Sequence, residues 1–331
     1  MRIGLSALSF SYRCGLVGQG TPRAVASPLS ADALITLAVR AGLTSLALPA
    51  ALLPALGTPQ LPTLRDRLLS CGLKLVVDAE IIGQVDLAGT MRTAAALGAS
   101  TVRVLASPVL EGLRATFTND WEAHLATVSA ILRDLAPLAT EYGVVLAVEN
   151  HQDLTADDLL TIMAAVDSPA VGVTFDPVNA LVVAEDPFTA LDQLGPYIRN
   201  IHLSDYLAYP SNEGWRLVRC ALGEGDLNLR RMLVMLAALA PDATCQIELV
   251  SHSSRHVRLL TDAWWQGYPP RDVRQIIPVL RELAAHARSR DDDWRSPWER
   301  GAAPDQIAQY EDRQFAASLN YLRALGAIPG A

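Results

Sequence analysis

The stretch Gly143-Val-Val-Leu-Ala-Val-Glu149-Asn-His151 decides how we interpret the fold of this chain. Its run of five apolar residues, all Val, Leu or Ala, is typical of a β-strand buried on both faces. A carboxylate and an imidazole follow directly, at the carboxyl end of that strand. Burying the charge of Glu149 without a partner would cost several kcal/mol, so we expect it to meet a cation, a proton or solvent.

Three further segments repeat this pattern, in which an apolar strand ends in a residue type that binds metal ions. They end in Asp176, His202 and Glu248, in that order along the chain. This repetition is the main functional signal of the sequence, because it predicts four similar strand ends that carry chemistry.

Strands and helices alternate along most of the chain, and several of the predicted helices end at a glycine. The pattern predicts strands at 2–6, 44–48, 73–77, 101–105, 144–149, 171–175, 198–203 and 244–248. It predicts the main helices at 33–41, 61–71, 86–97, 119–142, 155–166, 187–194, 229–239 and 272–286. Eight such units predict an α/β fold, the (β/α)8 or TIM barrel.

The alternative fold is an open, doubly wound sheet that binds a dinucleotide. Such a sheet would place G-x-G-x-x-G after the first strand, but Gly15, Gly18 and Gly20 do not have that spacing, and no Walker A motif occurs. We therefore expect a barrel, and no nicotinamide, flavin or pyridoxal phosphate cofactor.

The chain changes character near residue 290. We predict a catalytic barrel domain over 1–289 and a C-terminal extension over 290–331. The extension begins with a charged, irregular segment and continues into a predicted helix at 305–325. We expect this helix to pack on the barrel or on a neighbouring subunit.

The overall composition excludes several classes of function. The 331 residues carry a net charge of -8, which argues against a nucleic-acid partner, because phosphate binding needs a concentrated basic face. Its four cysteines show no C-x-x-C spacing, as expected for reduced thiols. No apolar run is long enough for a membrane span, so we expect no membrane partner and a cytoplasmic location.

In a (β/α)8 barrel, the carboxyl ends of the strands meet at one mouth, where the chemistry takes place. Glu149, Asp176, His202 and Glu248 would repel one another there unless a cation joined them. Carboxylate oxygens with one imidazole nitrogen suit Mn²⁺, and Mg²⁺, Co²⁺ or Zn²⁺ are alternatives. We therefore predict a divalent-metal site at these four residues.

Motifs around these positions resemble a known superfamily. They are Val148-Glu-Asn-His151, Thr174-Phe-Asp-Pro-Val-Asn179, Asn200-Ile-His-Leu-Ser-Asp205, Gly223-Glu-Gly-Asp226 and Ile247-Glu-Leu249. As a set, they resemble the xylose-isomerase-like superfamily, in the branch called sugar phosphate isomerase/epimerase. The resemblance covers roughly 1–285, with its diagnostic motifs within 144–250. It implies a Mn²⁺-type site at the four residues, with Glu149 and Glu248 also facing the substrate.

The resemblance implies an isomerase or epimerase acting on a keto-sugar that is free, phosphorylated or part of a 3-keto-glycoside. Glu149 and Glu248 would remove and return a proton next to the carbonyl, through an enediolate. The single lysine, Lys74, lies at the start of the third strand, so a Schiff-base mechanism has no nucleophile.

A lyase is the alternative. His151 follows Glu149 by two residues, so both side chains point to the same side of an extended segment. A similar Glu-x-His arrangement occurs in relatives that act on 3-keto-glycosides, including C-glycoside deglycosidases. His151 would then be the acid or base in a cleavage or dehydration. Its alternative role is a structural hydrogen bond to the loops at Asp153 or Asp205.

Four residues are candidates for substrate binding: Asn179, Arg103, Asp205 and Glu224. Related ketose epimerases carry a histidine where this chain has Asn179, whose amide can bind a hydroxyl but cannot transfer a proton. Arg103 suits a phosphate or carboxylate, and a salt bridge to a neighbouring carboxylate is the alternative. Asp205 could instead orient His202 or its own loop.

We expect a small-molecule sugar substrate and a homo-oligomer. If the deglycosidase interpretation holds, the partner would instead be a small second subunit. A DNA-repair endonuclease on the same fold would need more histidine ligands and a basic face, and the six histidines and negative net charge speak against it.

Overall fold

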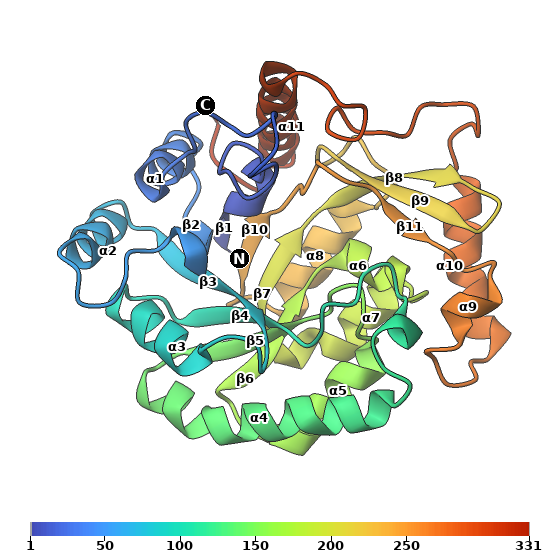
Figure 1. Ribbon diagram of the computed structural model, residues 1–331, viewed down its shortest axis with the longest axis horizontal. Coiled ribbons are helices and arrows are strands. Elements are labelled where there is room, and N and C mark those ends of the chain that lie inside the picture. The colour runs from blue at the N-terminus through green and yellow to red at the C-terminus, as the bar shows by residue number, and fades with distance from the viewer. Residues whose placement is uncertain (1, 331) are drawn as a thin grey trace.

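The computed structural model describes residues 2–330. Its centre is a closed barrel of eight parallel strands in the order β1-β10-β7-β6-β5-β4-β3-β2 (Figure 1). The strands are β1 (Arg2–Ser6), β2 (Ser45–Pro49), β3 (Lys74–Ile81), β4 (Thr101–Leu105), β5 (Val145–Glu149), β6 (Val171–Phe175), β7 (Ile198–Leu203) and β10 (Thr244–Ile247). The predicted TIM barrel is confirmed.

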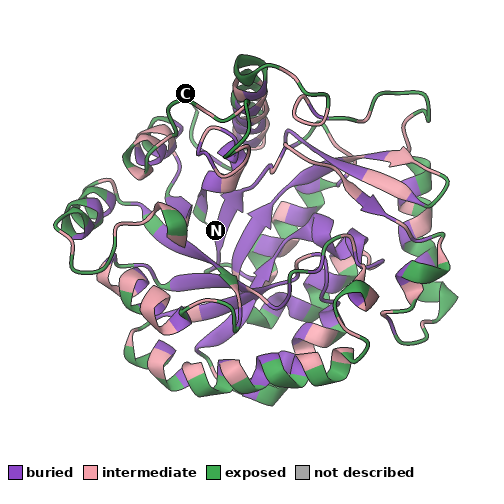
Figure 2. Cartoon of the chain, in the orientation of Figure 1, coloured by how far each residue is buried: buried purple, intermediate pink, exposed green. Residues whose placement is uncertain are grey.

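Helices surround the barrel and follow the predicted alternation. They are α1 (Ala31–Arg40), α2 (Gln60–Ser70), α3 (Leu87–Ala96), α4 (Trp121–Glu141), α5 (Ala156–Val166), α7 (Pro187–Leu194), α8 (Leu229–Leu239) and α10 (Val273–Ala285). The barrel strands are buried, whereas the helices expose their outer faces (Figure 2). No helix described between residues 2 and 330 is long and apolar enough to cross a membrane.

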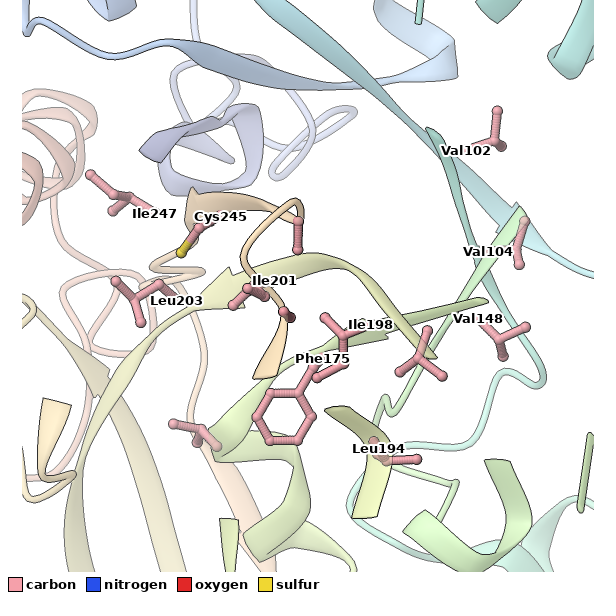
Figure 3. Close-up of a cluster of buried hydrophobic side chains, with 14 of the residues drawn as sticks. Val102, Val104, Val148, Phe175, Leu194, Ile198, Ile201, Leu203, Cys245 and Ile247 are labelled. Atoms are coloured by element: carbon pink, nitrogen blue, oxygen red, sulfur yellow. The ribbon is translucent and has the colours of Figure 1, made fainter. Parts of the chain in front are cut away.

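The two faces of the barrel strands differ in chemistry, because successive side chains of a strand alternate in direction. One alternate set is apolar and belongs to the main core, and Figure 3 shows members of it from β4, β5, β6, β7 and β10. These include Val104, Val148, Phe175, Leu203 and Ile247. The other set faces the barrel interior and is largely polar, which brings the functional side chains together.

One segment differs from its prediction. No strand was predicted between 204 and 226, where we expected a long loop, but most of this range forms an antiparallel hairpin of β8 (Asp205–Pro210) and β9 (Trp215–Cys220). Strand β11 (Arg255–Val257) joins β9, and we call these three strands the accessory sheet. The prediction missed the hairpin because its polar and charged residues hide a period of two, although Tyr, Trp, Leu and Val are good strand formers.

Six shorter helices also lie within residues 2–330. Helix α6 (Pro177–Val182) begins directly after β6, and α9 (Asp262–Trp265) follows the accessory sheet. Four short 3-10 helices also occur: η1 (Ala7–Phe10), η2 (Ala50–Leu52), η3 (Arg114–Thr116) and η4 (Gly195–Tyr197).

The C-terminal helix α11 (Pro304–Ala324) is present close to its predicted position. It packs against the segment that follows β1, where the rings of Phe10 and Phe315 lie 5.1 Å apart in an edge-on arrangement. The carboxylate of Glu311 accepts hydrogen bonds from the backbone N–H groups of Tyr12 and Arg13, at 2.7 and 3.0 Å. The helix thus contacts the barrel, while the division into domains at 289 and a subunit contact stay predictions.

Candidate active site

Four buried side chains meet at the carboxyl end of the barrel. Glu149 is the last residue of β5, Asp176 follows β6, His202 lies in β7 and Glu248 follows β10. One ligand atom from each lies within 4.8 Å of the others. The structure therefore brings together the four residues predicted as metal ligands, and we call them the ligand cluster.

Glu149 is held as an anion. Arg103 of β4, which faces the same interior, forms a salt bridge to Oε2, and the amide of Asn179 donates to Oε1 at 3.0 Å. Burial would raise the pKa of Glu149, but the Arg103 guanidinium and His202 outweigh it and hold that pKa well below its usual range. For Arg103, the structure shows the salt bridge that the sequence left as the alternative.

Asp176 is positioned by hydrogen bonds from three separate parts of the chain. Its Oδ1 accepts from the Val178 N–H, at the start of α6, and from the Ser204 hydroxyl at 2.8 Å. Its Oδ2 accepts from Nη2 of Arg219, on β9, at 2.8 Å. The same Nη2 lies 3.2 Å from the side-chain oxygen of Asn179. The accessory sheet therefore reaches the barrel mouth and contributes a cation there.

Glu248 has a different environment from Glu149. The hydroxyl of Ser6, at the end of β1, donates to Oε2 at 3.0 Å, and no arginine forms an ion pair with Glu248 among residues 2–330. Burial raises the pKa of Glu248 to about 7, in spite of the opposing effect of His202. A carboxylate with such a pKa can accept and return a proton near neutral pH.

His202 lies between the two glutamates. Its Nδ1 is 3.3 Å from Oε2 of Glu248 and 3.6 Å from Oε1 of Glu149. The side chain is fully buried, yet neither ring nitrogen has a hydrogen-bond partner among the described residues. Burial alone would lower the pKa of His202, but the Glu248 and Glu149 carboxylates raise it to about 9. The centre of the cluster thus attracts positive charge.

These observations fit a divalent metal ion. Three carboxylates and one imidazole form a donor set suited to Mn²⁺, Mg²⁺, Co²⁺ or Zn²⁺. Buried polar groups normally have a hydrogen-bond partner, but the ring nitrogens of buried His202 have none among the described residues. A metal ion would supply the missing partner. Ser6, Ser204 and Asn179 would orient the carboxylates around the ion.

His151 lies next to the ligand cluster. Its Nε2 is 3.4 Å from the amide nitrogen of Gln152, and its Nδ1 is buried without a partner in the described chain. Burial lowers the pKa of His151 to about 4, and Arg103 and Arg255 also disfavour the imidazolium. The ring is therefore neutral near neutral pH, and it forms none of the structural hydrogen bonds to Asp153 or Asp205 that we considered.

Two predicted substrate-binding residues lie in other environments. The carboxylate of Asp205 accepts hydrogen bonds from the backbone N–H groups of Tyr206, Gly223, Gly225 and Leu227. It therefore organises its own loop, as the alternative role suggested. Glu224 is exposed, and its side chain forms no hydrogen bond or ion pair within residues 2–330. A substrate role for either residue stays a prediction.

Two ionisable residues near the ligand cluster, Arg219 and Asp78, were not predicted from the sequence. To predict the position of Arg219, one would first have to predict the hairpin, because only the alternating side-chain directions of β9 place Arg219 on the inner face. Asp78 lies in β3, in register with Arg103, and neither of its buried carboxylate oxygens has a described hydrogen-bond partner. Burial raises the pKa of Asp78. Asp78 could have been predicted from the sequence, because it follows the apolar run of the third strand, as the four ligand residues follow theirs.

Comparison with known proteins supports the same fold. The family model described as "Xylose isomerase-like TIM barrel" matches residues 85–283. The 3-oxo-isoapionate decarboxylase of Pectobacterium atrosepticum is 25% identical over 274 residues, which cover 80% of this chain and 92% of that protein.

Two solved structures are similar in fold at low sequence identity. A D-psicose 3-epimerase from Clostridium cellulolyticum, solved with D-tagatose, has a TM-score of 0.61 at 15% identity, covering 96% of this chain and 98% of that one. The probable 3-DHS dehydratase AsbF of Bacillus anthracis has a TM-score of 0.59 at 17% identity, covering 76% and 94%. The family match, which spans more than half of the sequence, shows that this chain belongs to the xylose isomerase-like TIM barrel family.

Proposed function

We propose that this protein is a divalent-metal-dependent isomerase or epimerase that acts on a keto-sugar through an enediolate. The observation that carries the proposal is the ligand cluster, in which two glutamates with opposite pKa shifts flank a buried histidine that has no hydrogen-bond partner within residues 2–330. An epimerase among the structures of similar fold supports the reaction class.

Glu248 is the better candidate for the base that removes the proton next to the carbonyl. Without a bound ion, burial raises its pKa to about 7, and Ser6 fixes its orientation. A divalent ion at the cluster would lower that pKa and keep Glu248 ionised, ready to accept a proton from the substrate. Glu149 is held charged by Arg103 and Asn179, which suits a ligand more than a proton donor. A bound divalent ion would polarise the substrate carbonyl and so acidify the neighbouring C–H bond.

The second candidate is a lyase that uses the same site. The observation in its favour is the 3-oxo-isoapionate decarboxylase, which matches over most of both chains. In a decarboxylation, the C–C bond to the substrate carboxylate would break first, carbon dioxide would leave, and the resulting enediolate would take up a proton. In an elimination, the enediolate formed by proton removal would instead expel the leaving group. Neutral His151, beside Glu149, would be available to take up a proton in that reaction.

The first test is metal analysis with a variant of the proposed base. We expect about one divalent ion per chain, and we expect Glu248→Gln to reduce turnover at least 100-fold, since a general base contributes about 10²–10⁴. Glu122→Gln, which changes an exposed carboxylate on α4, is the matched control and should keep full activity. A native protein that neither holds metal nor binds Mn²⁺ would contradict the proposal.

NMR in deuterated water, with Mn²⁺ and a panel of keto-sugars and 3-keto-glycosides, identifies the reaction from its products. Deuterium at the α-carbon of an intact skeleton indicates an isomerase or epimerase. Release of an aglycone, water or carbon dioxide indicates the lyase. His151→Ala separates the two further, because proton exchange by Glu248 should survive this change better than cleavage.

A further inference from the structure

Two arginines of the accessory sheet share the face that points at the ligand cluster. Strands β9 and β11 are antiparallel, and Arg255 pairs with Leu217. Leu217 and Arg219 lie two residues apart on β9, so Arg219 and Arg255 are diagonal neighbours on one face, roughly 7–8 Å apart at the backbone. The hydrogen bond from Arg219 to Asp176 shows that this face looks into the barrel mouth.

Both arginines have N–H groups that are hidden from solvent and lack an acceptor among residues 2–330. Arg219 is only 3% exposed, and its Nε and Nη1 have no hydrogen-bond partner. Nη1 of Arg255 donates to the Ser253 hydroxyl at 3.0 Å, but its buried Nε has none. Leaving buried donors of a charged group unpaired is costly, so such groups indicate a missing acceptor.

The charge around the site also favours an anion. Burial and the repulsion from Arg219 lower the pKa of Arg255 to about 10, so both arginines are charged at neutral pH. Together with Arg103 and a divalent ion they would carry five positive charges, against at most four negative charges on Asp78, Glu149, Asp176 and Glu248. The filled site would therefore have at least one positive charge in excess.

We propose that Arg219 and Arg255 form a subsite for an oxyanion of the substrate, either a carboxylate or a phosphate ester. Guanidinium groups suit such ligands because their N–H groups match the spacing of two oxyanion oxygens. This inference deepens the proposed function, on which it rests for the place of the substrate, and names the charge that the keto-sugar carries.

Binding measured by calorimetry on the Mn²⁺-loaded protein tests the subsite. The probes are threonate against threitol, and glycerol 3-phosphate against glycerol, so each pair differs in the charged group. We expect the wild-type protein to bind at least one charged probe tenfold or more tightly than its neutral partner. The charged probe that shows the larger preference over its neutral partner identifies the oxyanion as a carboxylate or a phosphate ester. Arg255→Gln should remove about tenfold of that affinity and leave the neutral probes unchanged.

Arg216→Gln is the matched control, because Arg216 lies on the opposite face of β9, where it stacks on Trp294. It should keep the full preference for the charged probe. Arg255→Lys, which retains the charge but not the guanidinium, should fall between the wild-type protein and Arg255→Gln. Circular dichroism shows whether each variant is folded.

Equal binding of charged and neutral probes by the wild-type protein would overturn the inference, as would equal effects of Arg255→Gln and Arg216→Gln. The outcome is separate from that of the proposed function. A protein that binds Mn²⁺ and exchanges deuterium, but shows no preference for an anion, refutes the subsite alone. A preference that depends on Arg255 in a protein that binds no metal refutes the proposed function alone.

Discussion

Glu149 and Glu248 carry the same side chain into the same site, but their neighbours give them opposite properties. Arg103 and Asn179 hold Glu149 as an anion, whereas Glu248 accepts a hydrogen bond from the neutral hydroxyl of Ser6, and burial raises its pKa to about 7. When surroundings separate the pKa values of two carboxylates, the chemical roles of the two groups separate as well. We therefore propose proton transfer for Glu248 and positioning for Glu149.

His151 offers a prediction about charge. Since burial lowers its pKa to about 4, the imidazole should stay neutral from pH 5.5 to pH 8. In NMR spectra of the metal-free protein, we expect the Cε1 proton of His151 not to shift over this range. The resonance is assigned by its absence in His151→Gln. A midpoint near 6.5 would contradict the lowered pKa and allow His151 to be a proton donor at neutral pH.

The four residues of the ligand cluster could be predicted because each follows an apolar strand, and parallel strands of a barrel end at one mouth. Arg219 and Arg255 could not be predicted in the same way. Their positions depend on a hairpin and a third strand that come together across 35 residues of chain, from Cys220 to Arg255. No local pattern of residues specifies such a contact.

At the scale of elements, the accessory sheet depends on one buried carboxylate. Asp205 binds the backbone N–H groups of the Gly223-Glu-Gly-Asp226 turn, which returns the chain from β9 to α8. A side chain at Gly225 would place its Cβ 2.2 Å from Oδ1 of Asp205 and 2.5 Å from the carbonyl oxygen of Tyr206. The glycine is therefore required by a close approach, and the motif is a structural support for the hairpin.

This arrangement predicts the effect of Gly225→Ala. The new methyl group must displace Asp205 or the β8 backbone, and we expect it to lower the free energy of unfolding by about 1–3 kcal/mol, as overpacked sites do. Chemical denaturation measures the change. Glu224→Ala, at the exposed neighbouring position, is the control and should change stability by less than about 0.5 kcal/mol. Equal effects of both changes would refute the role of Asp205.

The barrel strands and surrounding helices could be predicted more fully than the accessory sheet. Val148 and Phe175 lie in apolar runs bounded by polar residues, and helices such as α5 begin at a clear capping residue, Thr155. Strand β9 carries an arginine among apolar residues on each face, with Arg219 on the inner face and Arg216 on the outer face, and its residues from Leu217 to Cys220 are all buried. Hydrophobic periodicity is weak in such a strand.

At the scale of the whole molecule, α11 connects the end of the chain to its beginning. Glu311 is 2% exposed and is the acceptor for two backbone N–H groups after η1. We expect Glu311→Ala to lower the free energy of unfolding by about 2–4 kcal/mol, because both donors then lack a partner. Asp312→Ala removes only the exposed ion pair with Arg13 and should cost less than about 1 kcal/mol.

Glu311 also predicts a pH dependence of stability. Burial raises its pKa from 4.5 to about 7, so between these values the folded protein holds a proton that the unfolded chain has released. The contribution of Glu311 to stability is therefore greatest below pH 4.5 and falls as pH rises to about 7. Relative to Glu311→Gln, the wild-type protein should lose up to about 3 kcal/mol over this range in denaturation experiments. A difference that does not change with pH would contradict the raised pKa.

The pairing of β1 with β10 has a consequence for the order of folding. Arg2 lies beside Thr244, so the barrel cannot close until some 240 residues have been synthesised and brought together. Contacts between such distant residues form slowly, because a long loop must first be ordered. Helix α11 attaches to the segment after β1 from still farther along the chain. Helix α11 therefore packs onto the barrel after the barrel has closed. Removing this helix should increase the unfolding rate more than it decreases the folding rate.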